Sequence, residues 1–259
     1  MKRALRAALV IAAVLAAVVP VATVTNGQPD GANHPYVGVA IQEIPSMPGF
    51  VSVCSGSALS PTAFLTAAHC FDPSLPVFVS FKSGPPFGAT FTPGVVTNHP
   101  LWCFECDHGA AGTDTHDVAV VSLLAPATAG PFALLPSVGL ADTLPTKTDV
   151  DLVGYGVQGF IRGGGKPGQV FLFTRYFAPS QLVQSNDVLS PQFLKLTANP
   201  SKGKGGVCFG DSGGPDLLAG TDTILAVNSL VTNTNCAGVT YSQRVDLPDI
   251  LEFIQGFLN

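Results

Sequence analysis

Ser212 lies in the part of this sequence best suited to covalent chemistry, the segment 207–215 (VCFGDSGGP). A nucleophilic serine needs a tight turn with few Cβ atoms, so that a substrate can approach its Oγ and backbone N–H groups can point at the developing oxyanion. Three glycines in the segment supply such a turn. The plainer interpretation is a Gly-rich turn without chemistry, and Gly-x-Ser-x-Gly also fits the nucleophile elbow of α/β-hydrolases.

The order of the histidines and the serine decides between these interpretations. An α/β-hydrolase has its catalytic histidine after the serine. In this chain every histidine precedes Ser212, namely His34, His69, His99, His108 and His116. The elbow interpretation is therefore excluded, and a catalytic histidine must come before the serine.

Two further residues have the setting that a base and its partner need. His69 follows an apolar run in the segment 65–70 (LTAAHC), where a buried strand and a neighbouring cysteine would hold an imidazole rigidly near water. Asp117 opens the segment 117–123 (DVAVVSL), at the mouth of a hydrophobic strand. A buried carboxylate is costly unless it accepts hydrogen bonds, and orienting an imidazole is one way to satisfy it.

The three segments together carry a family resemblance. In this order, TAAHC (66–70), DVAV (117–120) and GDSGGP (210–215) closely resemble the signature blocks of the chymotrypsin/trypsin-like serine proteases. The resemblance runs from about Val24 to the C-terminal helix. It implies an all-β fold of two six-stranded antiparallel β-barrels with a C-terminal α-helix, and a site in the cleft between the barrels.

The resemblance also implies a role for each residue of the site. The general base would be His69, its orienting acid Asp117 and the nucleophile Ser212, while the N–H groups of Gly210 and Ser212 would form the oxyanion hole. The expected activity is that of a serine endopeptidase on protein or peptide substrates.

The same resemblance implies disulfide partners for four of the six cysteines. Cys54 with Cys70 would match the family's bridge beside the catalytic histidine, and Cys208 with Cys236 would match the bridge that closes the primary specificity pocket. An even number of cysteines on an exported chain agrees with disulfides.

The remaining cysteines, Cys103 and Cys106, lie in the segment 103–108 (CFECDH). A small local disulfide is favoured for a secreted chain, while a zinc site that includes His99 or His108 stays open. Haem attachment is excluded, because Asp107 follows the second cysteine. We expect no metal and no cofactor.

The start of the mature chain departs from the common family pattern. In the family a freed N-terminus pairs with the acid that precedes the serine, here Asp211, and the segment 24–27 (VTNG) resembles that N-terminus. No lysine or arginine lies between Arg6 and Val24, so a trypsin-type activation cleavage is absent. Signal removal or trimming would have to create the new end, at Thr23 or Val24.

Three residues are expected to shape the primary pocket. Gly206, six residues before Ser212, would stand at its base, where specificity for Arg and Lys would need an aspartate. Ser229 resembles the family's serine beside the buried acid. Val231 stands where an open pocket usually has glycine, so we expect a shallow apolar pocket for small or medium P1 side chains.

Short strands must position these residues. Glycine and proline number 28 and 22 in 259 residues and only 11% of residues are charged, a profile typical of short strands joined by turns. Leucine and isoleucine at helical spacing between 247 and 258 predict one closing helix, with Asp246 as N-cap. β-branched and aromatic runs predict strands over 36–41, 51–53, 64–67, 77–81, 118–123, 150–153, 170–177 and 224–231.

Residues 1–23 are predicted to be a secretory signal peptide, which leaves one protease domain over 24–259. Three basic residues precede an unbroken apolar stretch that ends near Pro20 and Ala22. An uncleaved membrane anchor is the alternative, and Pro20 and the Ala-rich composition disfavour it. Signal removal changes the formal charge from −5 to −8, which argues against nucleic acid and anionic lipid as partners.

The sequence therefore predicts a secreted, monomeric enzyme that has no membrane contact after signal removal. Two other functions stay open. One is a catalytically silent binding or adhesion module on the same fold, and the other is an esterase, because the same mechanism cleaves activated esters.

Overall fold

The computed structural model describes residues 24, 27–103, 116–126, 130–161, 168–184 and 191–258. The expected signal peptide, residues 1–23, and Cys106 lie outside the described residues. Within these ranges, no helix combines the length and the hydropathy needed to cross a bilayer.

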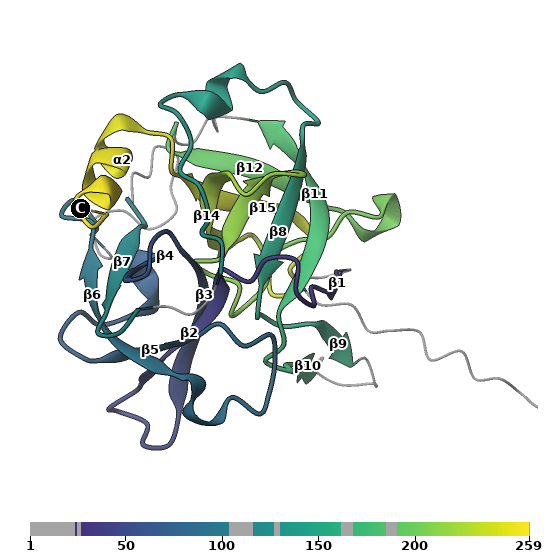
Figure 1. Ribbon diagram of the computed structural model, residues 1–259. Helices are drawn as coiled ribbons and strands as arrows, with labels where there is room; N and C mark the ends of the chain where they lie inside the picture. Colours follow the sequence, from purple (N-terminus) through teal and green to yellow (C-terminus); the bar gives the residue numbers. More distant parts are fainter. Residues whose placement is uncertain are drawn as a thin grey trace, which may run out of the picture.

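The first half of the chain forms a closed antiparallel barrel (Figure 1). Its strands follow one another around the barrel in the order β2-β3-β4-β7-β6-β5, and β5 pairs back onto β2. Residues alternate between core and solvent as period-2 strands require; in β6, for example, Val96 is buried and Val95 is exposed. The strands are β2 (Val37–Glu43), β3 (Val51–Ala58), β4 (Ala63–Thr66), β5 (Val77–Ser80), β6 (Thr92–Asn98) and β7 (Ala119–Leu123).

The second half forms another six-stranded antiparallel barrel, which closes where β11 pairs with β8. The short strand β1 (Gln28–Pro29) adds to the outside of β11, and β9 (Gly159–Ile161) and β10 (Gly168–Val170) form a separate hairpin. The barrel strands are β8 (Asp149–Gly154), β11 (Tyr176–Gln184), β12 (Phe193–Ala198), β13 (Pro215–Leu218), β14 (Ile224–Val231) and β15 (Gly238–Arg244).

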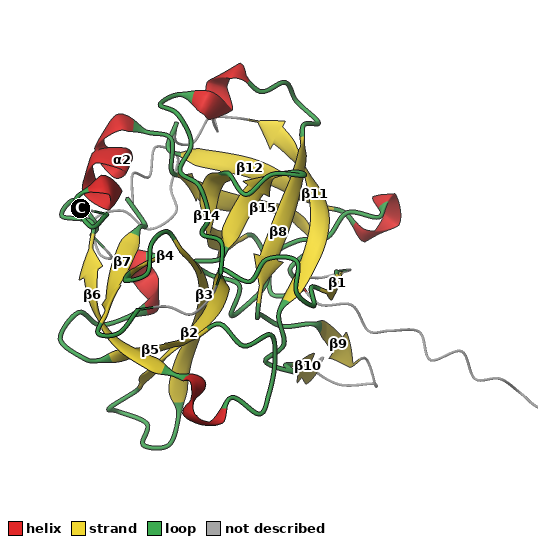
Figure 2. Cartoon of the chain, in the orientation of Figure 1, coloured by secondary structure: helices red, strands yellow, loops and turns green. Residues whose placement is uncertain are grey.

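One α-helix, α2 (Pro248–Gln255), closes the chain, and Figure 2 shows how little other helix there is beside the strands. Ile250, Leu251 and Ile254 of α2 belong to the core cluster that fills the first barrel and extends to residues of the second. Short 3₁₀ turns cover 68–70, 88–90, 140–143 and 200–202. The all-β fold of two six-stranded barrels and a C-terminal helix is confirmed.

The start of α2 differs from the sequence prediction. Its N-cap is Leu247, and the Asp246 side chain does not cap the helix. The Asp246 carboxylate instead accepts a hydrogen bond from Ala141 N at 2.8 Å and pairs with Arg244 at 2.8 Å. Arg244 is buried, and a buried guanidinium without an anion would be strongly destabilising. Pairing Asp246 with Arg244 therefore stabilises the fold more than capping the helix would.

The predicted strand over 170–177 is also wrong. β10 ends at Val170 and β11 begins at Tyr176. Between them Phe173 has φ 53°, a left-handed conformation that no strand contains. The aromatic residues of this stretch belong to a connection. Phe171 packs against Val157, Cys208 and Cys236 and contacts Phe173, so its hydrophobicity reflects tertiary packing and not a strand.

Candidate active site

The pairing of β4 with β7 brings a histidine and an aspartate together. Thr66 is the partner of Ala119 in this antiparallel register. His69 lies three residues beyond Thr66 and Asp117 lies two residues before Ala119, so both side chains meet at the same end of the strand pair. His69 Nδ1 is 2.7 Å from Asp117 Oδ2, and His69 N donates to Asp117 Oδ1 at 2.9 Å.

This contact fixes the proton on one nitrogen of the imidazole. An ionised carboxylate only accepts, so Nδ1–H donates to Asp117 and Nε2 keeps its lone pair. Burial lowers the pKa of His69, but the Asp117 charge and hydrogen bond outweigh it and raise the pKa above its usual value. Burial likewise acts to raise the pKa of Asp117, and the contacts with His69 and Ser229 reverse it, so that the acid stays ionised.

Ser229 completes the surroundings of the buried acid. Its hydroxyl donates to Asp117 Oδ2 at 2.5 Å, as expected for the serine beside the acid. Asp117 thus accepts three hydrogen bonds while only 2% of its surface is exposed. Its carboxylate is held in one orientation by partners on three sides.

The turn that carries Ser212 packs tightly against the segment before His69. Gly213 has φ 80°, and a Cβ at this position would lie 2.1 Å from Thr66 Oγ1 and 2.8 Å from Ala67 N. Only glycine permits this approach. His69 and Ser212 consequently line the same cavity, where a hydroxyl and a base of suitable tautomer can act on one bound group.

Hydrogen bonds anchor two carbonyl groups of the backbone just before Ser212. Val157 N donates to Phe209 O at 2.8 Å, and Gly214 N donates to Asp211 O at 2.9 Å. In a trans peptide the N–H points opposite to the C=O, so the N–H groups of Gly210 and Ser212 point away from these anchors. This is the orientation that the predicted role of both N–H groups as oxyanion donors would need.

Ser55 on β3 is a residue of this site that the sequence analysis missed. Its hydroxyl donates to Gly210 O at 2.9 Å and accepts from Tyr155 N at 2.9 Å, while its own N–H donates to Ser212 O at 2.8 Å. Ser55 therefore joins the first barrel to the turn that carries Ser212. No sequence signal marks it, because a serine next to a cysteine is unremarkable without the fold.

Asp211, the residue before the serine, is fully buried beneath the same turn. Its carboxylate accepts hydrogen bonds from Gly156 N at 2.8 Å and Cys208 N at 2.9 Å. Burial raises its pKa to about 7, and these two N–H groups only partly offset the effect. Val24, the expected new N-terminus, is 1% exposed and packs with the core of the second barrel.

The cavity beside His69 and Ser212 has a volume of about 260 Å³. Of the three residues expected to shape the primary pocket, Ser229 and Val231 line it. Gly206 lies behind the wall, where a Cβ would be 2.3 Å from Ala198 Cβ. The other lining residues are Val207, Cys208, Phe209, Asn228 and Leu230.

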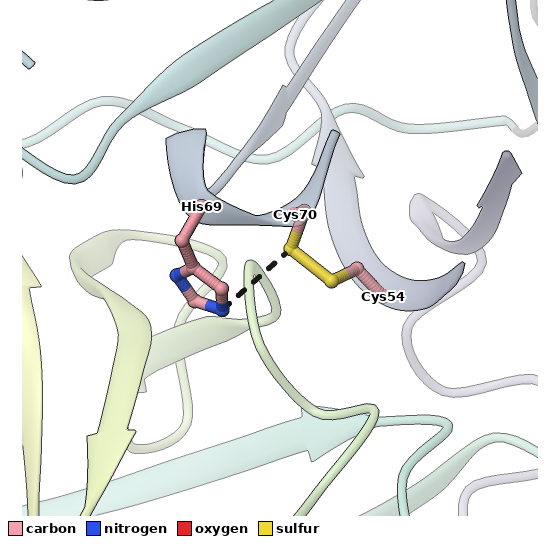
Figure 3. Close-up of side chains that lie close together, drawn as sticks. All are labelled: Cys54, His69 and Cys70. Atoms are coloured by element: carbon pink, nitrogen blue, oxygen red, sulfur yellow. Dashed lines mark hydrogen bonds between the residues drawn. A yellow bond between two sulfur atoms is a disulfide. The ribbon is translucent and has the colours of Figure 1, made fainter. Parts of the chain in front are cut away.

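Two disulfides flank the site as the resemblance implied. Cys54 bonds to Cys70, directly after His69 (Figure 3). Cys208, which lines the cavity, bonds to Cys236. Within the described residues, Cys54, His69 and Cys70 form the one cluster whose donor atoms lie close enough for a metal ion. The two sulfurs are bonded to each other, so neither is the thiolate that a metal would need.

The third cysteine pair is described only in part. Cys103 is disulfide-bonded, which disfavours its use as a zinc ligand. Its expected partner Cys106 and the candidate ligand His108 lie outside the described residues. His99 is buried and stacks on His116, with ring centroids 4.8 Å apart.

Comparison with known proteins gives the same architecture. The sequence model of the family described as Trypsin matches residues 27–251. A structure described as HL collagenase has a TM-score of 0.67 at 18% identity, covering 89% of this chain and 95% of that one. Human heparin binding protein has a TM-score of 0.64 at 18% identity, covering 90% of this chain and 96% of that one. These likenesses concern the fold.

Proposed function

Because the chain belongs to the trypsin family, we propose that it is a secreted serine endopeptidase that acts as a monomer on protein or peptide substrates. The nucleophile is Ser212, the general base His69 and the orienting acid Asp117. The observation that carries the proposal is the strand register that holds His69 against Asp117 at the cavity lined by Ser212.

The mechanism follows from the tautomer and the backbone donors. Ser212 Oγ attacks the carbonyl carbon of the scissile bond while its proton moves to His69 Nε2. The N–H groups of Gly210 and Ser212 stabilise the oxyanion, and Asp117 stabilises the imidazolium. His69 then protonates the leaving amine, and a water molecule hydrolyses the acyl-enzyme by the same steps.

The walls of the cavity support a small or medium apolar P1 side chain. Val207, Leu230 and Val231 supply apolar surface, and each CH₂ group buried against them contributes about 0.8 kcal/mol. Among the described residues, no acidic side chain lines the cavity. A P1 aromatic ring is disfavoured by Val231, which fills space that a glycine would leave open.

Two other functions use the same fold. A binding module without catalysis is the first, and human heparin binding protein is named for binding heparin. Heparin is a polyanion, and the net charge of this chain is −5, which opposes that ligand. An esterase is the second, and the ratio of peptide to ester hydrolysis distinguishes it from a peptidase.

A labelled phosphonate directed at activated serines tests the proposal. The mature protein should incorporate one label per molecule, mapped by peptide sequencing to Ser212. Ser212→Ala and His69→Ala should abolish labelling and lower peptide hydrolysis on the order of 10⁴-fold or more, because the three residues act as one unit. A folded wild-type protein that takes up no label would support the binding module, and a label on another serine would refute the assignment.

A further inference from the structure

We propose that Asp216, buried beneath the primary pocket, gives the enzyme a second P1 class with a cationic end, lysine above all, in addition to aliphatic residues. This inference rests on the proposed peptidase function. Asp216 would be a specificity-determining residue that acts from β13. It would supply the negative charge that specificity for lysine needs and that Gly206 does not provide.

The strand register places Asp216 inside the second barrel, below the cavity. Asp216 is opposite Ala226 on β14 and Leu152 on β8, both members of the barrel's apolar core. Two residues after Ala226 on the same strand, Asn228 lines the cavity. Ser242 is opposite Asn228 on β15.

Polar side chains form a continuous path from the cavity to this acid. The Ser242 hydroxyl donates to Asn228 Oδ1 at 3.4 Å. The same hydroxyl lies close enough to Asp216 to favour its ionised form, although not in the geometry of a full hydrogen bond. Thr240, two residues before Ser242, points to the same side of β15.

The hydrogen bonding of this group is incomplete. Among the described residues, neither oxygen of Asp216 has a hydrogen-bond partner, nor has Asn228 Nδ2 or Thr240 Oγ1. Asp216 and Asn228 are 0% and 1% exposed, so solvent does not satisfy these atoms. Unpaired buried polar atoms are rare, and those beside a cavity indicate a bound polar group.

A cation fits this group better than an anion or an amide. Burial raises the pKa of Asp216 to about 8, the cost of an acid without a counter-charge. An ammonium would remove that cost by pairing with the carboxylate, whereas a P1 carboxylate would add a second acid. The lysine stem is unbranched, so it can lie along Val207 and Val231. Its Nζ would then reach the polar floor, the group formed by Asn228, Thr240, Ser242 and Asp216.

Other charges near Asp216 do not take this role. Asp149 and Asp151 on β8 and Lys195 on β12 alternate with inward-facing core residues, so they point out of the barrel. Arg244 lies in the same row as Ala226, and its guanidinium is already paired with Asp142 and Asp246. Asp216 is thus the one inward-facing acid on the described parts of β8, β11, β12, β13, β14 and β15.

Linkage sets the sign of the pH dependence. A lysine ammonium can pair only with ionised Asp216, so binding at a pH below the pKa of that acid must release its proton. The ratio of kcat/KM for P1 lysine to kcat/KM for P1 alanine should rise about tenfold per pH unit between pH 6 and 8. It should then be level until lysine itself deprotonates near about 10.4. Protonation of His69 lowers kcat/KM by the same factor for both substrates, so its effect cancels in the ratio.

Two peptide substrates that differ only at P1, lysine or alanine, test the proposal in the mature enzyme from pH 6 to 9. Wild type should show the rise, and Asp216→Asn, which keeps the volume, should show a flat ratio, about 100-fold lower at pH 8.5. The matched control is Asp151→Asn, which removes an outward-facing acid from β8 and should keep the rise. A flat ratio in wild type, or an unchanged rise in Asp216→Asn, would overturn the proposal.

A binding measurement that does not depend on catalysis separates this inference from the peptidase proposal. In calorimetry at pH 8.5, n-butylammonium should bind to wild type and to Ser212→Ala at least tenfold more tightly than n-butanol, with proton release at pH 7. This preference should vanish in Asp216→Asn. If the protein prefers n-butylammonium but hydrolyses no peptide, only the peptidase proposal is refuted. If it cleaves the alanine substrate but shows no preference for n-butylammonium, only the proposed role of Asp216 is refuted.

Discussion

At the scale of single residues, the signature segments predict which side chains meet but not what holds them. His69, Asp117 and Ser212 stand in motifs whose chemistry is readable from residue type and order. Ser55 and Asp216 have no such signal. Their importance comes from partners distant in sequence, Gly210 for Ser55, which is 155 residues away, and Ser242 for Asp216, which lies on another strand. A motif describes local chemistry, and these two residues act through tertiary contacts.

Ser55 is expected to act as a positioning residue for the oxyanion donors. Ser55→Ala would leave Gly210 O and Tyr155 N without their buried partner, which costs about 1–3 kcal/mol and lets the Gly210 peptide rotate. We expect kcat to fall on the order of 10-fold with KM little changed. The affinity for a peptide aldehyde, which forms a tetrahedral adduct, should fall in parallel.

Ser52→Ala is the matched control for this variant. Ser52 lies on the same strand and its hydroxyl also donates to a backbone oxygen, Cys70 O at 3.0 Å, but not near the oxyanion donors. Loss of the Ser52 hydroxyl should change kcat less than about twofold if each hydrogen bond acts locally. Equal losses of kcat in both variants, or a loss in KM alone, would show that Ser55 only stabilises β3.

At the scale of elements, the sequence predicts the strands that are continuous runs of apolar residues, and it misses several strands whose runs are interrupted by polar residues, proline or glycine. β4 and β7 are runs of apolar residues and were predicted close to their observed bounds. β13 and β15 were not predicted, because their inward positions carry Asp216 in one strand and Thr240 and Ser242 in the other, so the period-2 alternation is absent. β6 and β12 were missed as well, although their inward positions carry Val96 in one strand and Leu194 and Leu196 in the other. Polar inward residues therefore account for only part of the missed strands.

The N-terminal segment at Val24 is the element expected to control the oxyanion loop. A freed α-amino group would pair with Asp211, whose pKa of about 7 without that partner would then fall. Asp211→Asn should lower kcat/KM on the order of 10²-fold, the size of one lost oxyanion donor, while the His69–Asp117 contact is kept. Activity should also fall at alkaline pH, as an amine with a solution pKa near about 8, raised by pairing, loses its proton.

N-terminal sequencing of the active enzyme checks this assignment. A start at Thr23 or Val24 is expected, and acetylation of that amine should reproduce the loss seen in Asp211→Asn. Fully active enzyme whose chain starts well before Thr23 would contradict the mechanism, because a longer chain has no amine within reach of Asp211.

At the scale of the whole molecule, the site depends on how the two barrels are joined, because His69 comes from the first barrel and Ser212 from the second. Arg175, just before β11, is one joint. It pairs with Asp30 at 2.7 Å and donates to Val37 O on β2 at 3.0 Å and to Gly31 O at 2.8 Å. Both side chains of the ion pair are buried, so neither is screened by solvent.

Removing one partner of this joint should destabilise the protein far more than removing both. Arg175→Met would leave Asp30 buried with only His34 as a partner, and the free energy of unfolding should fall by about 3–5 kcal/mol. Arg175→Met combined with Asp30→Asn should recover a large part of that loss, because no uncompensated charge remains. Urea unfolding at pH 7, followed by tryptophan fluorescence, measures both.

The pH dependence of this joint has a fixed sign. Burial raises the pKa of Asp30, and the contacts with His34 and Arg175 outweigh it, so the folded-state pKa lies below the unfolded value. The stabilisation is therefore complete above the unfolded pKa of about 3.9 and is lost as the pH falls through the lower folded pKa. Asp30→Asn should flatten the fall in unfolding free energy below about pH 4. A fall as steep as that of wild type would mean that other carboxylates dominate acid unfolding and that the barrels are joined mainly by their apolar contacts.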